Sequence, residues 1–228
     1  MAKPPSTRSS SKEIDRFLQR SRAITQFAEK QPRLLFAVDA TASRQPTWNR
    51  ASKLQQEMFD ATRKVATLTV QLCYYRGFNE FFAGPWLTNS AALARHMARV
   101  RCAGGHTQIA RLLRHARAEH RKVPLRAVVF IGDALEENPD TLCDLAGQCG
   151  LLRLPLFLFQ EGAQPTVEQT FRSMARLSGG AYARFDTRSA DTLAALLGAV
   201  ACYAAGGAAA LENSASDSAK LLLQQLKP

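Results

Sequence analysis

The chain has 228 residues, of which 46% are hydrophobic and 21% charged, and its formal net charge is +11. This length suits one domain with appendages, and the composition supports a buried core and argues against global disorder. We expect no apolar segment that approaches the roughly 18 residues of a membrane-spanning helix. Residues 1–12 are basic and Ser-rich and lack the apolar stretch of a secretory signal. These features predict neither a membrane-spanning segment nor export.

The cysteine content points in the same direction. The five cysteines are an odd number and form no Cys-x-x-Cys pair. This spacing argues against a disulfide framework and against a zinc knuckle. We therefore expect reduced, mostly buried thiols and a cytoplasmic location.

The positive charge is concentrated in one block of the chain. Residues 95–126 carry nine Lys and Arg against Glu119 alone, a net charge of +8, whereas residues 127–228 carry seven against eleven acids. A basic block attracts acidic proteins, nucleic acid or anionic lipid headgroups. A well-solvated helix surface would have the same composition.

Apolar patterning divides the chain into strands and helices, taken here in chain order. The predicted strands span 33–39, 67–75, 80–83, 125–132, 154–160 and 181–185. The predicted helices span 13–29, 47–64, 90–100, 107–122, 141–150, 167–177 and 191–205. A Gly206–Gly207 pair breaks the last helix, and the tail beyond it contains a short amphipathic segment, KLLLQQLK.

This alternation predicts an α/β fold in three layers, a mostly parallel central sheet flanked by helices. We divide the chain into a basic arm with an amphipathic helix (1–32), an α/β domain (33–205) and a C-terminal tail (206–228). In such sheets the ligand crevice lies beyond the carboxyl ends of the strands. We therefore expect the functional residues in the loops at that edge.

Three of these loops carry polar residues that suit a cation. The first strand ends in Asp39, followed by Thr41 and Ser43; Thr107 opens a predicted helix; and Asp133 follows the strand at 125–132. Ligand sets made only of oxygen favour a hard cation, Mg²⁺ before Ca²⁺ or Mn²⁺. The sequence therefore predicts a metal site built from these loops.

The pattern resembles a von Willebrand factor type A (VWA) domain with its metal-ion-dependent adhesion site. The family signature is Asp-x-Ser-x-Ser after the first strand, a Thr in a later loop and an Asp after the fourth strand. This chain has all three motifs in the family order, and the resemblance covers residues 33–205. It departs from the family in having Thr41 in place of the usual Ser, and in lacking the Gly that commonly follows the last Asp.

The resemblance implies a role for each residue. Thr41, Ser43 and Thr107 would bind the metal through their hydroxyls, and Asp39 and Asp133 would act largely through bound waters. A Glu or Asp of a protein partner would then replace one water on the cation. We therefore expect a non-catalytic, metal-dependent binding module that serves as a scaffold in an intracellular assembly. The alternative within the same fold is a vestigial metal site.

Two further readings use other residues. The predicted helix 107–122 has Arg111, Arg114, Arg117 and Arg121 opposite its apolar face, where they could bind further acids of a partner. The same arginines make nucleic acid, RNA above all, the second candidate partner. A phosphohydrolase of the haloacid dehalogenase type is a weaker alternative, because that family has a second Asp where Thr41 stands. The sequence does not predict the oligomeric state.

Other chemistry-bearing residues have ordinary explanations. Glu136 and Glu137 belong to an acidic stretch after Asp133, for which we expect a solvated surface or a role in tuning the water shell of the metal. His115 and His120 are five residues apart on a predicted helix and do not share a face. We therefore expect these histidines to be solvated.

Overall fold

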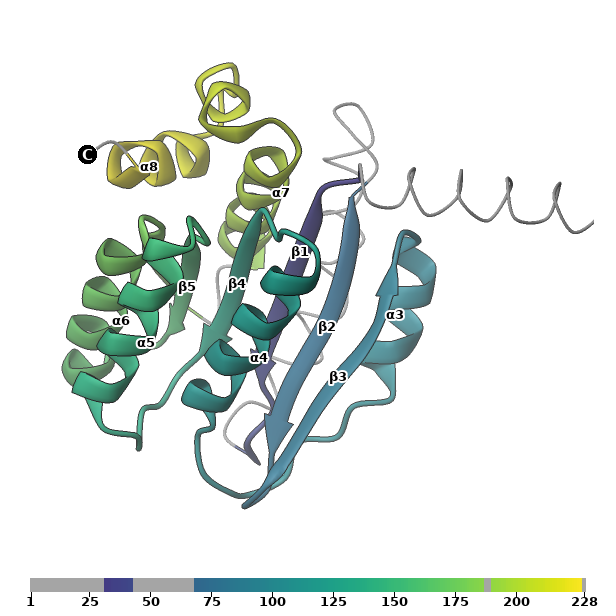
Figure 1. Cartoon of the computed structure of the whole chain (residues 1–228), viewed down its shortest axis with the longest axis vertical. Helices are drawn as coiled ribbons and strands as arrows, with labels where there is room; N and C mark the ends of the chain where they lie inside the picture. The colour runs from purple at the N-terminus through teal and green to yellow at the C-terminus, as the bar shows by residue number, and fades with distance from the viewer. Residues whose placement is uncertain (1–30, 43–67, 187–189, 227–228) are drawn as a thin grey trace, which may run out of the picture. The chain divides into compact units, whose positions relative to one another are not determined.

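Six strands pair into one sheet in the order β3-β2-β1-β4-β5-β6 (Figure 1). The computed structural model describes residues 31–42, 68–186 and 190–226. Adjacent strands are parallel except β2 and β3, which are antiparallel. The strands are β1 (Arg33–Asp39), β2 (Thr69–Arg76), β3 (Glu80–Leu87), β4 (Ala127–Gly132), β5 (Leu156–Glu161) and β6 (Ala181–Phe185).

Helices cover both faces of the sheet, which confirms the predicted fold class. The chain divides into two compact units, Met1–Gln31 and Pro32–Pro228, and the sheet and its helices belong to the second. The helices are α3 (Ser90–Ala98), α4 (Ile109–Lys122), α5 (Pro139–Leu151), α6 (Pro165–Ser178), α7 (Ala190–Glu212) and α8 (Asp217–Leu226). The helices predicted at 13–29 and 47–64 lie outside the described residues.

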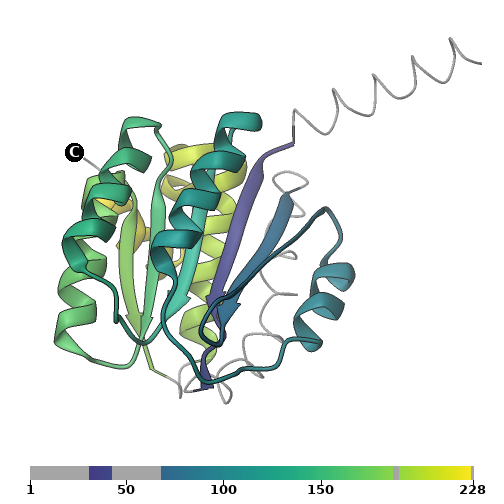
Figure 2. The same cartoon turned by 60° about the horizontal axis from the view of Figure 1, so that its bottom comes forward.

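Alternate residues of each strand supply two separate cores. Leu35 and Ala37 of β1 belong to the core under α4, α5 and α6. Leu34, Phe36 and Val38 belong to the other core, under α3, α7 and α8. Figure 2 shows α4, α5 and α6 on one side of the sheet and α7 behind it. Because side chains alternate along a strand, one apolar run fills both cores.

The described elements agree with the predicted ones within a few residues, with one extension in the sheet. Strand β3 runs from Glu80 to Leu87, four residues past its predicted end. It pairs with β2 from Arg76 opposite Glu80 to Val70 opposite Leu87, with a register shift between Gln71 and Cys73. The side chain of Gln71 bridges the irregularity, because its Nε2 donates to the Gly84 carbonyl at 2.9 Å.

Helix α7 corrects the expectation that no apolar segment approaches the length of a membrane span. Residues Asp191–Glu212 form one helix that is long and apolar enough to cross a membrane by length and composition, with a mean hydropathy of 1.8. A core helix passes the same test, and Leu196, Leu197 and Val200 are buried against the sheet. One face of α7 thus packs on the core, and 39% of the apolar window is buried. The predicted break at the Gly206–Gly207 pair is confirmed as a kink at Gly207, where φ is 69°, and helical residues resume beyond it to Glu212.

Helix α8 packs against the outer strand of the sheet. Its Gln225 side chain donates from Nε2 to the Tyr182 carbonyl and accepts from the Tyr182 amide, both at 2.9 Å. An unpaired strand edge is a template for pairing with another chain, and covering it with a helix removes that template. The KLLLQQLK segment therefore docks within its own chain and satisfies part of the β6 edge.

We predict that Gln225→Ala destabilises the domain by about 1 kcal/mol, since it removes two hydrogen bonds to backbone groups at a partly exposed site. This corresponds to a loss of roughly 2–4 °C in the unfolding midpoint. Gln224 is exposed and is the matched control, for which we expect a change within about 0.5 kcal/mol. Equal midpoints for the two variants would contradict the role assigned to Gln225.

Candidate metal centre

Asp39, the last residue of β1, has no exposed surface. Its Oδ1 accepts a hydrogen bond from the Thr41 amide at 2.7 Å, and its Oδ2 accepts one from the Tyr75 hydroxyl at 3.1 Å. Burial raises the pKa of the Tyr75 hydroxyl, and the charges of Asp39, Glu137 and Asp133 raise this pKa further. Tyr75 therefore keeps its proton and donates a hydrogen bond to Asp39. A buried carboxylate needs such donors to offset the loss of its hydration.

The loop that carries Thr107 is attached to the end of β1 by backbone hydrogen bonds. The Ala103 amide donates to the Ala40 carbonyl at 3.1 Å, and the His106 amide donates to the Gly77 carbonyl at 3.2 Å. Gly105 lies so close to Gly77 that a Cβ atom on Gly105 would be 1.9 Å from the Gly77 carbonyl oxygen. Only glycine allows this approach, so Gly105 fixes the path of the loop.

Thr107 is joined in turn to the loop that follows β4. Its hydroxyl accepts from the Glu136 amide at 3.1 Å, and its own amide donates to Glu136 Oε2 at 2.9 Å. The Thr107 side chain also forms a hydrogen bond to the Glu137 carboxylate, one of the contacts that lower the pKa of Glu137. A hydroxyl has one donor and two acceptor sites. With one acceptor site used by Glu136 and the donor used by Glu137, Thr107 keeps one acceptor site for a cation.

Glu137 caps helix α4, which begins at Ile109 without a hydrogen bond from its own capping side chain, Gln108. The carboxylate accepts from the Ile109 amide and, at 2.9 Å, from the Ala110 amide. Burial raises the pKa of Glu137, and the bonds from Ala110, Ile109 and Thr107 oppose this rise. An anion at a helix N-terminus is also stabilised by the helix dipole. Glu137 thereby fixes the start of α4 beside Thr107.

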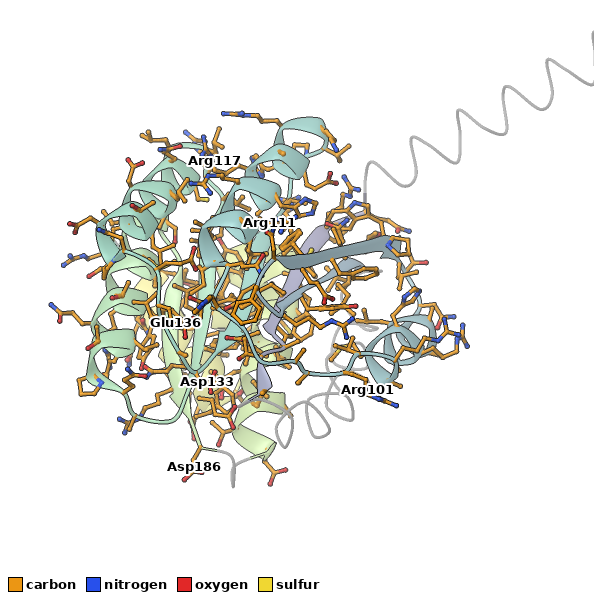
Figure 3. All side chains as sticks on the ribbon, turned by 90° about the horizontal axis from the view of Figure 1, so that it is seen from below. Arg101, Arg111, Arg117, Asp133, Glu136 and Asp186 are labelled. Atoms are coloured by element: carbon orange, nitrogen blue, oxygen red, sulfur yellow. The ribbon has the colours of Figure 1, made fainter. Side chains whose placement is uncertain are left out.

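Asp133 follows β4 and is the described carboxylate that best fits a cation or its bound water. The β1–β4 register pairs Val38 with Ile131, so Asp39 and Gly132 are neighbours and Asp133 comes next. A Cβ atom on Gly132 would be 3.8 Å from the Asp39 Cβ. Asp133 Oδ1 is buried without a hydrogen-bond partner within the described part of the chain. Figure 3 views this end of the sheet, with Asp133 and Glu136 near its centre.

The structure thus gathers Asp39, Thr41, Thr107 and Asp133 at one edge, while Ser43 lies outside the described residues. The donors fit a hard cation, because they are hydroxyl and carboxylate oxygens and include one buried acceptor without a donor. Residues 31–42, 68–186 and 190–226 contain no group of three His, Cys, Asp or Glu side chains placed to hold a metal ion.

Comparison with known proteins supports the fold through structure alone. No family model and no curated protein matches the sequence. Among solved structures, the SpRpn10 VWA domain matches with a TM-score of 0.57 and 10% identity, over 72% of this chain and 95% of that one. The vWF domain of the pilus tip protein Mfa5 from Porphyromonas gingivalis matches with a TM-score of 0.57 and 8% identity, over 75% and 94%.

The chain has the VWA fold. Proximal thread matrix protein 1 from the mussel byssus also matches, with a TM-score of 0.60 and 12% identity, over 75% of this chain and 46% of that one. In that structure zinc occupies the adhesion-site motif. The VWA fold places the first-strand motif and the residue after β4 at one edge of the sheet, which is where this chain has Asp39 and Asp133.

Sequence reasoning missed Tyr75 at the VWA site, and considered Glu136 and Glu137 only as a solvated surface or as residues that tune the water shell of the metal. Tyr75 binds Asp39 across 36 positions of the sequence, and Glu137 reaches α4 across 27 or 28. Glu136 binds Thr107 and, at 3.1 Å, the ring of His106. The acidic stretch after Asp133 was the sequence feature that could have indicated these glutamates. Glu137 is not simply solvated, because it helps to hold Thr107 in place.

The four arginines predicted to lie opposite the apolar face of α4 are only partly exposed. Arg114 and Arg121 are exposed, whereas Arg117 is half-buried and its Nε lies buried without a hydrogen-bond partner among the described residues. Arg111 is exposed and donates to the carbonyl and side-chain oxygens of Asn79 at 3.0 and 3.1 Å. Arg111 is thus bound to the turn between β2 and β3, and Arg117 does not lie fully on the exposed face.

The expectation of solvated histidines on α4 was wrong. His115 is half-buried and its Nε2 is 3.0 Å from Gln71 Oε1. Burial lowers the pKa of His115, and the charge of Glu119 opposes this shift. His120 Nδ1 accepts a hydrogen bond from the Leu125 amide at 3.1 Å. Both rings serve packing at the interface of α4 with the sheet.

We predict that Glu137→Ala destabilises the domain by about 1–2 kcal/mol, because α4 loses its N-terminal cap. The unfolding midpoint should fall by roughly 2–6 °C, and Glu137→Gln, which keeps an acceptor oxygen, should fall less. Asp144→Ala is the matched control, because Asp144 is exposed and bonds only to Gln148 among the hydrogen bonds described. If Glu137→Ala unfolded at the same temperature as this control, the capping role would be wrong.

Proposed function

We propose that this chain is a non-catalytic protein-binding module that takes an acidic side chain of its partner at a divalent cation, Mg²⁺ first. The observation that carries the proposal is that Asp133 Oδ1 is buried without a hydrogen-bond partner among the described residues, whereas both carboxylate oxygens of Asp39 accept hydrogen bonds. Ser43, Thr41 and Thr107 would hold the cation through hydroxyls, and Asp39 and Asp133 through its waters. The cation, when bound, would supply a Lewis-acidic position that a partner carboxylate can fill.

The chain's own residues prepare this position. Tyr75 and the Thr41 amide orient Asp39, and Glu136 and Glu137 orient Thr107. Because these residues are oriented by hydrogen bonds within the chain itself, binding a cation requires little rearrangement of the carboxyl edge. The partner's carboxylate would then join a cation that has few anionic ligands of its own. Such a site favours exchange of partners over permanent binding.

A binding role also fits better than the enzymatic alternative. A nucleophilic carboxylate of the dehalogenase type must reach its substrate, but Asp39 has no exposed surface and both of its oxygens accept hydrogen bonds. Thr41 cannot act as the acid and base partner in that mechanism. The VWA structures that the chain resembles include a pilus tip protein and a byssus matrix protein whose adhesion-site motif is occupied by zinc.

Nucleic-acid binding remains the second prediction. Arg114 and Arg121 are exposed on α4, as are Arg95 and Arg99 near the end of α3. These residues would contact phosphates through charge alone, so binding would weaken steeply with salt. The half-burial of Arg117 shortens the row that the sequence predicted.

We predict that about 10 mM Mg²⁺, compared with EDTA, stabilises the wild-type chain by roughly 1.4 kcal/mol if the dissociation constant is about 1 mM. This equals about 3–6 °C in the unfolding midpoint. Asp133→Asn should lose the shift and yet be no less stable in EDTA, because it removes a buried charge that lacks a donor.

Asp144→Asn, the exposed control, should keep the Mg²⁺ shift. Measuring Ca²⁺ and Mn²⁺ in the same way ranks the three cations. No shift with any of them in the wild-type chain, or an equal shift in Asp133→Asn, would contradict the proposed site.

A further inference from the structure

The tip of the β2–β3 hairpin, Gly77–Asn79, carries the most exposed aromatic side chain among the described residues. Phe78 is 78% exposed. Large apolar side chains that stand out from a surface mark interaction sites, and aromatic residues often supply most of the energy of such an interface. The other large apolar residues with high exposure are Leu151, Leu177 and Leu221, which lie on helices α5, α6 and α8.

The hairpin tip is attached to the loop that carries Thr107. The Gly77 carbonyl accepts from the His106 amide, and the rings of Phe78 and His106 meet edge to face with centroids 5.4 Å apart. Arg76 Nη1 donates to the Arg101 carbonyl at 2.9 Å. Arg111 Nη1 holds Asn79 from the start of α4. Phe78 is therefore exposed on a well-anchored turn beside the candidate metal centre, and the residue that it contacts, His106, directly precedes Thr107.

A hollow of about 360 Å³ lies on the hairpin next to this tip. It is lined by Tyr74, Arg76, Asn79, Glu80, Phe81, Phe82 and Arg111. Arg76 in this lining is already paired with Glu80, whose Oε2 lies 2.7 Å from Arg76 Nε. The cation that the hollow offers is therefore the exposed Arg111 guanidinium, which lies 5.3 Å from the centroid of the Phe81 ring. Such a hollow suits a carboxylate on a short aliphatic stem.

Charge differs between the two sides of the candidate metal centre. Figure 3 shows Arg101 beside α3. Asp186 follows β6, at the other end of the strand order, and Asp133 follows β4, in the middle of the sheet. The exposed Arg101 and Arg111 therefore attract an acidic segment that reaches the cation toward the hairpin.

We propose that the hairpin tip is a second contact for the partner: a large apolar side chain packs on Phe78 and a second carboxylate enters the hollow and binds the Arg111 guanidinium. The occupant is a protein segment that combines two acids with an apolar residue. This inference rests on the proposed function, because the first acid of the same segment is the one taken by the cation.

The test begins with a random-peptide phage library selected on the full chain, once in Mg²⁺ and once in EDTA. We expect the Mg²⁺ selection to enrich two acids with a large apolar residue, and the EDTA selection to lose this pattern. A synthetic peptide of the enriched sequence is then titrated against variants. Phe78→Ala should weaken its binding by about tenfold or more, and Phe78→Leu by less. Leu151→Ala removes an equally exposed side chain elsewhere and should bind as wild type does.

The hollow is tested by a cycle of substitutions. Replacing the second acid of the peptide by its amide should weaken binding to wild type several-fold, and should have little effect on Arg111→Ala. Arg121→Ala, an exposed arginine at the far end of α4, is the charge control. Thermal unfolding confirms that each variant is folded.

The outcomes separate the two proposals. Acidic, EDTA-sensitive peptides without an apolar preference, which bind Phe78→Ala as tightly as wild type, would overturn the second contact and leave the proposed function standing. The absence of any Mg²⁺-dependent peptide would count against both. Binding of a single-stranded homopolymeric RNA in EDTA that Phe78→Ala abolishes would overturn the protein partner in favour of nucleic acid.

Discussion

Parallel pairing of β1 with β4, with Val38 opposite Ile131, is the constraint on which the candidate site depends. Although β4 begins 88 residues after β1 ends, both strands finish at one edge of the sheet, so that Asp39 and Asp133 come from neighbouring positions. The antiparallel hairpin of β2 and β3 returns the chain from this edge, and the loop after α3 comes back to it with Thr107. The site is thus a consequence of strand order, and its details come from hydrogen bonds between loops.

Those hydrogen bonds differ in how completely they satisfy each carboxylate. Asp39 accepts hydrogen bonds from the Thr41 amide and the Tyr75 hydroxyl, and Glu137 accepts them from the first amides of α4. Asp133 Oδ1 has no such donor within the described residues. Since buried polar atoms are usually paired, the difference identifies where an external cation or its water would gain most. Phe78 is comparable among the apolar residues, because the fold leaves this large side chain exposed and it would gain most from contact with a partner.

Periodicity and spacing predicted the fold well, because runs such as RLLFAVD are apolar on both faces and alternate with helical patterns. They also predicted the edge at which Asp39, Thr107 and Asp133 meet. They could not predict Tyr75 or Glu137, because these contacts join segments about 30 residues apart whose spacing only the folded loops define. They did predict the interruption at the glycine pair, which the structure has as a kink at Gly207. The roles of Ser43 and the cytoplasmic location stay predictions.

The central claim, a hard-cation site between β1, β4 and the Thr107 loop, is tested most directly by titrating Mn²⁺ into the ¹⁵N-labelled chain and following paramagnetic broadening of its amide signals. We expect the amides of Thr41, Thr107 and Glu136 to broaden first, excess Mg²⁺ to restore them, and Asp133→Asn to abolish the effect. Broadening centred on Asp140 and Asp144, or on Asp186, would contradict the account, and so would uniform broadening without a centre.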